Sequence, residues 1–254
     1  MMRLAGAALL CAAGGLAQAQ VLYGVASFTN FGSQSLYSIN PSTGSATLIG
    51  NTGLRQIAGL DWDGGSGRLI ALTASGDSFA LNTSTGAATR VVDANFGVPE
   101  GSIALETAGT FAPIFDNLHR WNGAGWSLVG PSGLAPGADI SGLDGTGTAL
   151  FGLALNDARA DQLVRFDTNT GVASVVGDTG TNGLAVGGLA FDWDLGRLFM
   201  TDGLNLYSIN TSTGAASSIG SLGVAGFSGL AYVPAPGAAT MVLAGALAAS
   251  RRRR

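Results

Sequence analysis

The sequence predicts an all-β chain built from a repeated unit, and three observations lead to this prediction. A segment that begins at Leu36 returns at Leu206 with eleven of fifteen residues identical. Weaker copies begin at Ser78, Leu118 and Gln162, which gives five copies spaced by about 40 residues. Of the 254 residues, 41 are glycine and 11% are charged, a composition that excludes a coiled coil and an acidic disordered tail.

Each copy predicts a β-hairpin. Apolar side chains alternate on both sides of a turn, as at Tyr37 and Ile39, and this period of two is typical of strands. An Asn or Asp opens each turn, at Asn40, Asn82, Asn122, Asp167 and Asn210. Its side chain can bond the backbone ahead of it, and the glycine that follows accepts the positive φ of a tight turn.

A second hairpin fills the interval between successive copies. Its first strand carries Gly-Leu or a similar pair in each unit, at Gly59-Leu60, Ala104-Leu105, Gly142-Leu143, Gly188-Leu189 and Gly229-Leu230. Its turn and second strand stand out in Asp63–Leu69 and Asp192–Leu198, and aligning Arg68 with Arg197 places Asp63 opposite Asp192. Two hairpins per unit make four strands, which is the blade of a β-propeller.

The two ends of the repeat region predict how a ring of blades closes. The strand Phe227–Val233 lacks a following partner, whereas Val21–Ser27 lacks a preceding one. Pairing them completes the blade that contains Leu36–Gly50, so we expect a five-bladed propeller with four-stranded blades. A β-sandwich does not explain the period, and a β-helix needs a shorter one. Pro113 interrupts the third unit and predicts an edge or bulge there.

Residues Met1–Ala19 predict a secretory signal peptide with a helical apolar core. An arginine near the start is followed by an apolar run, and Ala17 and Ala19 are the small residues typical of a cleavage site. The mature chain is expected to begin at Gln20. The single cysteine, Cys11, lies inside this signal, so we expect no disulfide and no thiolate metal site in the exported body.

The other end carries three elements in order: a proline-containing motif, an apolar segment and an arginine cluster. The motif is Val233, Pro234, Ala235 and Pro236, and the cluster is Arg251, Arg252, Arg253 and Arg254. This order resembles the PEP-CTERM sorting signal of Gram-negative bacteria, whose proteins are substrates of a membrane-bound exosortase. Ala235 stands where that family has Glu.

The resemblance implies export, transient inner-membrane anchoring by a C-terminal apolar helix, cleavage near the proline motif and delivery to the cell surface or beyond. The terminal arginines are expected to act as a cytoplasmic stop signal. The apolar segment, residues 237–250, is shorter than the roughly 20 residues that span a bilayer, and an ordinary tail anchor is the alternative. The predicted domains are therefore a signal peptide at 1–19, a propeller at 20–234 and a sorting or anchor segment at 235–254.

Few residues predict a catalytic or metal site. The one histidine, His119, lies in a strand-like stretch and is expected to be a strand-surface residue. After the Gly-Leu pairs, the presumed inner strands carry three acids and two alanines: Asp61, Glu106, Asp144, Ala190 and Ala231. Acids gathered near a propeller axis can bind Ca²⁺ or hydrolyse glycosides, but the favoured interpretation is that they accept backbone amides at strand ends.

The sequence therefore favours a non-enzymatic, exported binding or structural protein, associated with extracellular polysaccharide or a surface protein and processed by exosortase. No cofactor and no catalytic residue are predicted. The body has seven arginines and no lysine against 16 acidic residues, which excludes nucleic acid as a partner. The alternative is a glycoside-active enzyme, or a Ca²⁺-dependent carbohydrate binder, that uses the axial carboxylates.

Overall fold

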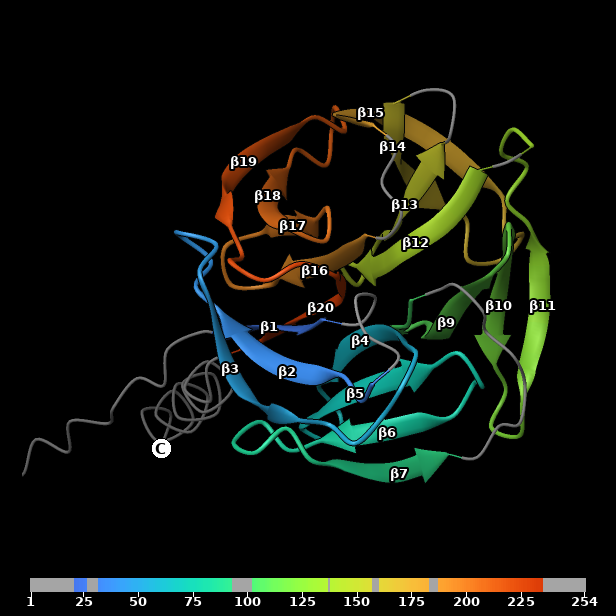
Figure 1. The fold of residues 1–254 in the computed structure, drawn as a ribbon. Helices are drawn as coiled ribbons and strands as arrows, with labels where there is room; N and C mark the ends of the chain where they lie inside the picture. The colour runs from blue at the N-terminus through green and yellow to red at the C-terminus, as the bar shows by residue number, and fades with distance from the viewer. Residues whose placement is uncertain are drawn as a thin grey trace, which may run out of the picture. The chain divides into compact units, whose positions relative to one another are not determined.

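The computed structural model describes residues 21–26, 32–92, 102–136, 138–156, 160–182 and 187–234. These residues belong to one compact unit, Gln20–Pro234. They contain no helix, and their strands form five antiparallel sheets of four strands each. Figure 1 shows the sheets arranged as blades around a common centre. The predicted five-bladed, all-β propeller is confirmed, whereas both predicted terminal helices lie outside the described residues.

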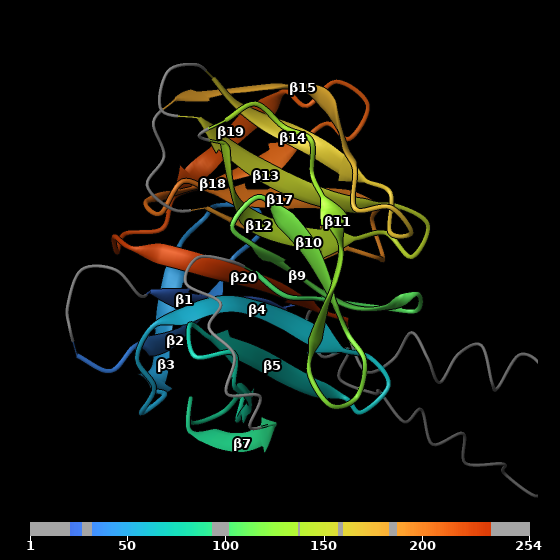
Figure 2. The same cartoon turned by 90° about the vertical axis from the view of Figure 1, so that its right-hand side faces the viewer.

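Blade 1 joins the two ends of the repeat region. Its strands, from the centre outward, are β20 (Phe227–Val233), β1 (Val21–Ala26), β2 (Ser35–Ile39) and β3 (Ala46–Asn51). The register places Val21 opposite Val233, so the strands nearest the two ends of the unit are hydrogen-bonded neighbours. Figure 2 shows β20 beside β1. The predicted ring closure is confirmed.

Each of the other blades is continuous in sequence. Blade 2 comprises β4 (Ile57–Asp63), β5 (Arg68–Thr73), β6 (Ser78–Leu81) and β7 (Ala88–Val92). Blade 3 comprises β8 (Ala104–Glu106), β9 (Gly109–Ile114), β10 (Asn117–Trp121) and β11 (Trp126–Pro131). Blade 4 comprises β12 (Ala138–Gly145), β13 (Leu150–Asn156), β14 (Ala160–Phe166) and β15 (Ala173–Asn182). Blade 5 comprises β16 (Gly188–Asp192), β17 (Arg197–Thr201), β18 (Asn205–Ile209) and β19 (Ala216–Ser221).

The hydrophobic core is divided among the five blade junctions. Each junction holds one cluster of buried apolar side chains; between blades 5 and 1, for example, Phe199 packs with Phe227 and Leu230. Among the described residues, four clusters contain eight or nine buried members, and the cluster between blades 2 and 3 contains six. Burial between neighbouring sheets is the main stabilising contribution to such a fold.

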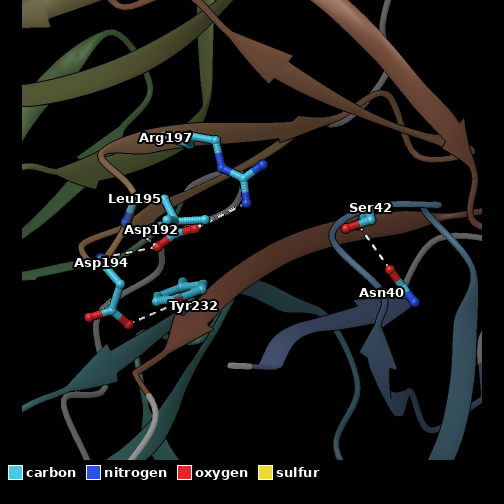
Figure 3. A network of polar contacts seen from close by, with 7 residues as sticks. All are labelled: Asn40, Ser42, Asp192, Asp194, Leu195, Arg197 and Tyr232. Atoms are coloured by element: carbon cyan, nitrogen blue, oxygen red, sulfur yellow. Dashed lines mark hydrogen bonds and ion pairs between the residues drawn. The ribbon is translucent and has the colours of Figure 1, made fainter. Parts of the chain in front are cut away.

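The turns of the outer hairpins have the predicted chemistry. The Asn40 carboxamide oxygen accepts the Ser42 amide at 2.9 Å (Figure 3), and Gly44 has a φ of 80°. The same bond recurs at Asn82 with Ser84 at 2.9 Å, at Asp167 with Asn169 at 2.8 Å and at Asn210 with Ser212 at 2.8 Å. Asn122 bonds Ala124 at 2.9 Å in the shorter turn of blade 3.

These turns also contact the preceding blade, which the sequence did not predict. A Cβ added to Gly50 on β3 would lie 2.2 Å from the carbonyl oxygen of Thr85 in the turn of blade 2. The same close approach occurs at Gly130 with Thr170, Gly177 with Thr213 and Gly220 with Thr43. Only glycine allows backbone to approach backbone so closely. We call each of these four contacts an outer clasp.

The junction between blades 2 and 3 departs from this pattern on both sides. By strand pairing, Val92 on β7 holds the place that Gly50 holds on β3. The turn that would meet it, Asn122-Gly123-Ala124-Gly125, lacks the threonine and is shorter. The glycine and its partner turn are therefore missing together at this junction.

Blade 3 also corrects one predicted register. In the other blades the glycine of the Gly-Leu pair lies against the amide of the leucine in the next blade; a Cβ added to Gly188, for example, would lie 3.0 Å from the Leu230 amide nitrogen. A Cβ added to Gly59 would lie 2.6 Å from the amide nitrogen of Ile103. Ser102-Ile103 therefore stands where the Gly-Leu pair was expected at Ala104-Leu105. Both choices are consistent with strand alternation, because a shift of two residues keeps each side chain on the same face.

Pro113 lies in a part of β9 that is paired with a neighbouring strand on one side only. The pairing between β8 and β9 ends at Ala104 with Phe111, so Pro113 lies beyond it and pairs with Leu118 of β10 alone. Proline is tolerated at such a position because it has no amide hydrogen to donate. The prediction was an edge or bulge position: β9 is an inner strand of its sheet, but Pro113 lies where its pairing with β8 has ended.

Candidate functional site

The predicted axial acids lie on inner strands, where the blades meet. Asp61 on β4 is 7% exposed, and Asp144 on β12 is 5% exposed. The carboxylate of Asp61 accepts the amides of Trp62 at 2.6 Å and Leu105 at 2.5 Å. One donor belongs to its own strand and the other to the next blade, so this side chain bridges blades 2 and 3.

Asp144 repeats this arrangement at the junction of blades 4 and 5. Its carboxylate accepts the amides of Gly145 and Phe191, both at 2.6 Å. Glu106, at the end of β8, accepts the Gly147 amide at 3.1 Å and so links blades 3 and 4. All three acids therefore accept backbone amides, as the favoured interpretation predicts, and three successive junctions are bridged near the axis.

The corrected register places Glu106 two residues beyond the position of the two aspartates. Ala104 of β8 corresponds to Asp61 and Asp144, as Ala190 and Ala231 do in blades 5 and 1. Two residues along a strand is about 6.6 Å, so Glu106 lies on the same strand face but nearer the end of the propeller. The backbone positions of the three acids therefore do not lie at one height along the axis, although their carboxyl groups are close enough to repel one another.

Burial dominates the electrostatics of these acids. It raises the pKa of Asp61 to about 7, although the Leu105 and Trp62 amides oppose the shift. Burial also raises the pKa of Asp144 well above its usual range, and repulsion from the Asp61 carboxylate adds to the effect. The pKa of Glu106 is raised by burial and held back by the Gly147 and Gly145 amides. A proton is therefore retained on this group of acids near neutral pH.

The contacts of the axial acids limit what they can bind. Among the described residues, no group of three or more His, Cys, Asp or Glu side chains is placed to hold a metal ion. Both oxygens of each buried aspartate already accept amides, which leaves few lone pairs for a ligand. What the arrangement does chemically is to satisfy amides of adjoining blades with buried carboxylates.

His119 lies on β10, as expected for a strand residue, and is partly buried. Burial lowers the pKa of its imidazole, and its Nδ1 lies 3.3 Å from the Asn117 carbonyl oxygen. The residue paired with it on β11 is Leu128, whose side chain cannot take part in acid–base chemistry.

A second arrangement lies at the inner turn of blade 5, residues 192–197. The buried carboxylate of Asp192 accepts the amides of Asp194 and Leu195, both at 3.0 Å, and the guanidinium of Arg197 at 3.3 Å. Asp194 in turn accepts the hydroxyl of Tyr232 on β20 at 3.0 Å, which ties the turn to blade 1 (Figure 3). Asp192 therefore holds the turn together internally, and Asp194 holds it against blade 1.

This turn presents Trp193 and Leu195 outward, with 49% and 59% of each residue exposed. The sequence was interpreted here only as turn chemistry, which the contacts of Asp192 confirm. The exposed pair was missed. The signal that could have found it is the alignment of Asp63 with Asp192, which sets Trp193 and Leu195 against Gly64 and Ser66.

The predicted sorting motif lies at the end of the described unit. Val233 is the last residue of β20, and Pro234 follows it. Ala235, Pro236 and the arginines 251–254 lie outside the described residues. In the part of the chain that the structure describes, no helix has the length and apolar character needed to cross a membrane.

Five four-stranded blades closed by the first and last strands define the class of protein as a five-bladed β-propeller. No protein-family model matches the chain, and no curated protein matches it. Among solved structures, a chain of a nidogen/laminin complex is similar to it, with 12% identity and a TM-score of 0.57 over 85% of this chain and 99% of that one. A candidate 6-phosphogluconolactonase from Bacteroides fragilis has 9% identity and a TM-score of 0.48 over 87% of this chain and 99% of that one. At such identities the likeness shows the fold alone.

Proposed function

We propose that this protein is an exported, surface-directed propeller with a binding or structural role, anchored transiently in the inner membrane and released by an exosortase. The support comes from the signal-like start, from the proline motif at Val233–Pro236 and from the apolar segment that the four arginines follow. Its partners are then the secretion machinery and exosortase during export, and extracellular polysaccharide or a surface protein afterwards.

One structural observation carries the proposal. Val21 and Val233 are paired residues of β1 and β20, and they stand next to the two expected cleavage points. A chain that begins at Gln20 and ends after Pro234 keeps every strand of all five blades. Both processing steps are therefore compatible with a closed propeller, in which the inner strand of blade 1 keeps its partner.

The glycoside-active alternative receives no support from the axial acids. Glycosidases of this kind need two carboxyl groups facing one substrate across an open site. Asp61 and Asp144 are buried, and each accepts two backbone amides. We therefore propose a binding or structural role without catalysis, in which the turns supply the contacts with the partner.

The intact mass of the protein recovered from its native host tests this proposal. We expect a species that starts near Gln20 and lacks residues Arg251 to Arg254, with the C-terminal cut near Pro234–Pro236. A variant with Pro234 and Pro236 both replaced by Ala is the matched control, and it should accumulate with its C-terminus intact. Retention of all four arginines in the wild-type protein would instead establish a tail anchor.

A further inference from the structure

Two large apolar side chains are exposed on a single short turn, between β16 and β17. They are Trp193 and Leu195. Single exposed apolar residues are ordinary on protein surfaces, and Leu48 on β3, 60% exposed, is one of them. A tryptophan and a leucine two residues apart on a fixed turn need a reason, because loops carry function more often than strands do.

The fold does not supply that reason, because blade 2 makes the same turn without them. There the Asp63 carboxylate accepts the Gly65 amide at 2.9 Å, as Asp192 accepts that of Asp194. The closing bond is the same in both turns: Gly67 donates to the Asp63 carbonyl, and Gly196 to the Asp192 carbonyl, both at 2.8 Å. Blade 2 has Gly64 and Ser66 at the positions of Trp193 and Leu195, so this turn forms without large apolar side chains.

The indole of Trp193 is held in one orientation. It packs edge to face on Phe191, with ring centroids 5.3 Å apart and planes at 90°. Its far edge lies over Gly147 in the inner turn of blade 4, where an added Cβ would be 3.0 Å from Cη2. The ring therefore bridges two blades while half of the residue stays exposed, and little conformational freedom is left for a ligand to remove.

The groups around this ring are polar but contain no unpaired cation in the contacts described. Thr146 and Thr148 flank Gly147, with their hydroxyl oxygens 3.3 Å apart. The carboxylate of Glu106 accepts the Gly147 amide at 3.1 Å, and Arg197 is bound by Asp192. The carboxylates of Glu106 and Asp194 disfavour an anionic ligand here, whereas hydroxyl donors suit them.

We propose that the inner turn of blade 5 is a carbohydrate-binding site, with Trp193 as the platform on which one sugar ring of an uncharged glycan chain stacks. The proposal deepens the binding role given above and rests on it. An indole face carries negative charge density and attracts the polarised C–H groups of a pyranose, and it buries apolar area at the same time. The threonine hydroxyls and the carboxylates of Glu106 and Asp194 then bond the hydroxyl groups of the glycan, and Leu195 extends the apolar contact.

Exchanging the two apolar residues for their blade 2 counterparts tests the site. The double variant Trp193→Gly/Leu195→Ser keeps Asp192, Asp194 and the glycine of the turn, so the turn should form as it does in blade 2. The probes are dextran, hydroxyethyl cellulose and galactomannan, measured with the full-length chain by affinity electrophoresis. We expect the wild-type protein to be retarded by at least one of them and the variant to lose at least tenfold in affinity. The variant should still unfold cooperatively, with a melting temperature lowered only as far as the lost contacts of Trp193 with Phe191 and Gly147 require.

Leu48→Ser is the matched control, since it removes an equally exposed leucine far from the turn, and it should leave the affinity unchanged. Equal retardation of the double variant and the wild type would overturn the site but leave the binding role standing. Absence of retardation of the wild type by all three glycans would overturn the glycan assignment, without affecting the processing measured by intact mass. Binding of oligolysine that the double variant loses would overturn it in favour of a cationic peptide.

Discussion

The junction between blades 5 and 1 and the junction between blades 2 and 3 are held together in different ways. The first has an outer clasp, Gly220 against Thr43, and a buried alanine at the axial position. Among the described residues, the second has Val92 in place of the glycine and no clasp. Near the axis it has Asp61, which accepts the Leu105 amide. The first junction therefore has a contact at the rim that the second lacks, and the second has a buried carboxylate near the axis that the first lacks.

The difference shows that the repeated turn has two roles that can be separated. Blade 3 keeps Asn122 and a positive-φ glycine, Gly123, and still forms its hairpin, so the turn does not require the threonine. The carbonyl of the threonine contacts the neighbouring blade, and the threonine is absent where the preceding strand has no glycine to receive it. Repeat residues thus encode contacts between blades as well as structure within each one.

The strongest test of this contrast is pH, because a buried acid at the centre should make one junction sensitive to it. Burial raises the pKa of Asp61 from 3.8 to about 7, so the folded state holds a proton that the unfolded chain releases. The resulting stability is fully present below about pH 4 and is lost as pH rises through 7. At 1.36 kcal/mol per pKa unit, the loss amounts to about 4 kcal/mol.

Urea unfolding at pH 4.5 and pH 8.5, for wild type and Asp61→Asn, measures this loss. The substitution is expected to lower the free energy of unfolding at pH 4.5, because the NH₂ group of the new asparagine would face a backbone amide donor. It is also expected to reduce the difference in the free energy of unfolding between pH 4.5 and pH 8.5. Asp144 has a raised pKa as well, so some slope of the same sign should remain. An unchanged slope in Asp61→Asn would contradict the assignment.

The clasp gives the next largest expected effect. In Gly220→Ala the new Cβ would lie 2.1 Å from the Thr43 carbonyl oxygen, and backbone must move to admit it. We expect a loss of about 3 kcal/mol in the free energy of unfolding. Gly125→Ala is the control, since nothing lies within 4 Å of its added Cβ, and it should cost less than about 0.5 kcal/mol. Equal effects in the two variants would remove the distinction between the junctions.

The smallest expected effect concerns Trp126, which belongs to the cluster between blades 2 and 3. Its indole N–H is buried and has no hydrogen-bond partner in the described structure. Removing an unsatisfied donor returns about 1–3 kcal/mol, which offsets the lost packing, so Trp126→Phe should change stability by less than about 1 kcal/mol. Trp121→Phe, in edge contact with the same ring, provides the comparison in thermal unfolding. A loss of about 3 kcal/mol in Trp126→Phe would show that the N–H is satisfied.

Strand pairing and ring closure could be predicted because the alternation, the turns and the repeat period all pointed the same way. The position of β8 could not, since Ala104-Leu105 is closer in type to Gly-Leu than Ser102-Ile103 is. The clasps could not be predicted either, because the need for Gly50 comes from the Thr85 carbonyl of another blade. Local sequence does not record such contacts.

The turn that forms the candidate site could be predicted from the sequence, but the exposure and orientation of its apolar side chains could not. Asp192 follows from turn chemistry, and its amide bonds agree with the alignment to Asp63. The orientation of Trp193 depends on Phe191 and on Gly147 of the neighbouring blade, which only the assembled ring brings together. Likewise, the amides that Asp61 and Asp144 accept come from the next blade in each case.

Closure of blade 1 by β1 and β20 has a consequence for the order of folding. Val21 is synthesised roughly 200 residues before its partner Val233, so this pairing has the greatest sequence separation among the strand pairings described. Blades 2 to 5 are continuous in sequence and can each collect their strands as the chain emerges. A chain that stops short of Phe227 lacks the inner strand of blade 1, so the ring cannot close until the last residues of the unit have been synthesised.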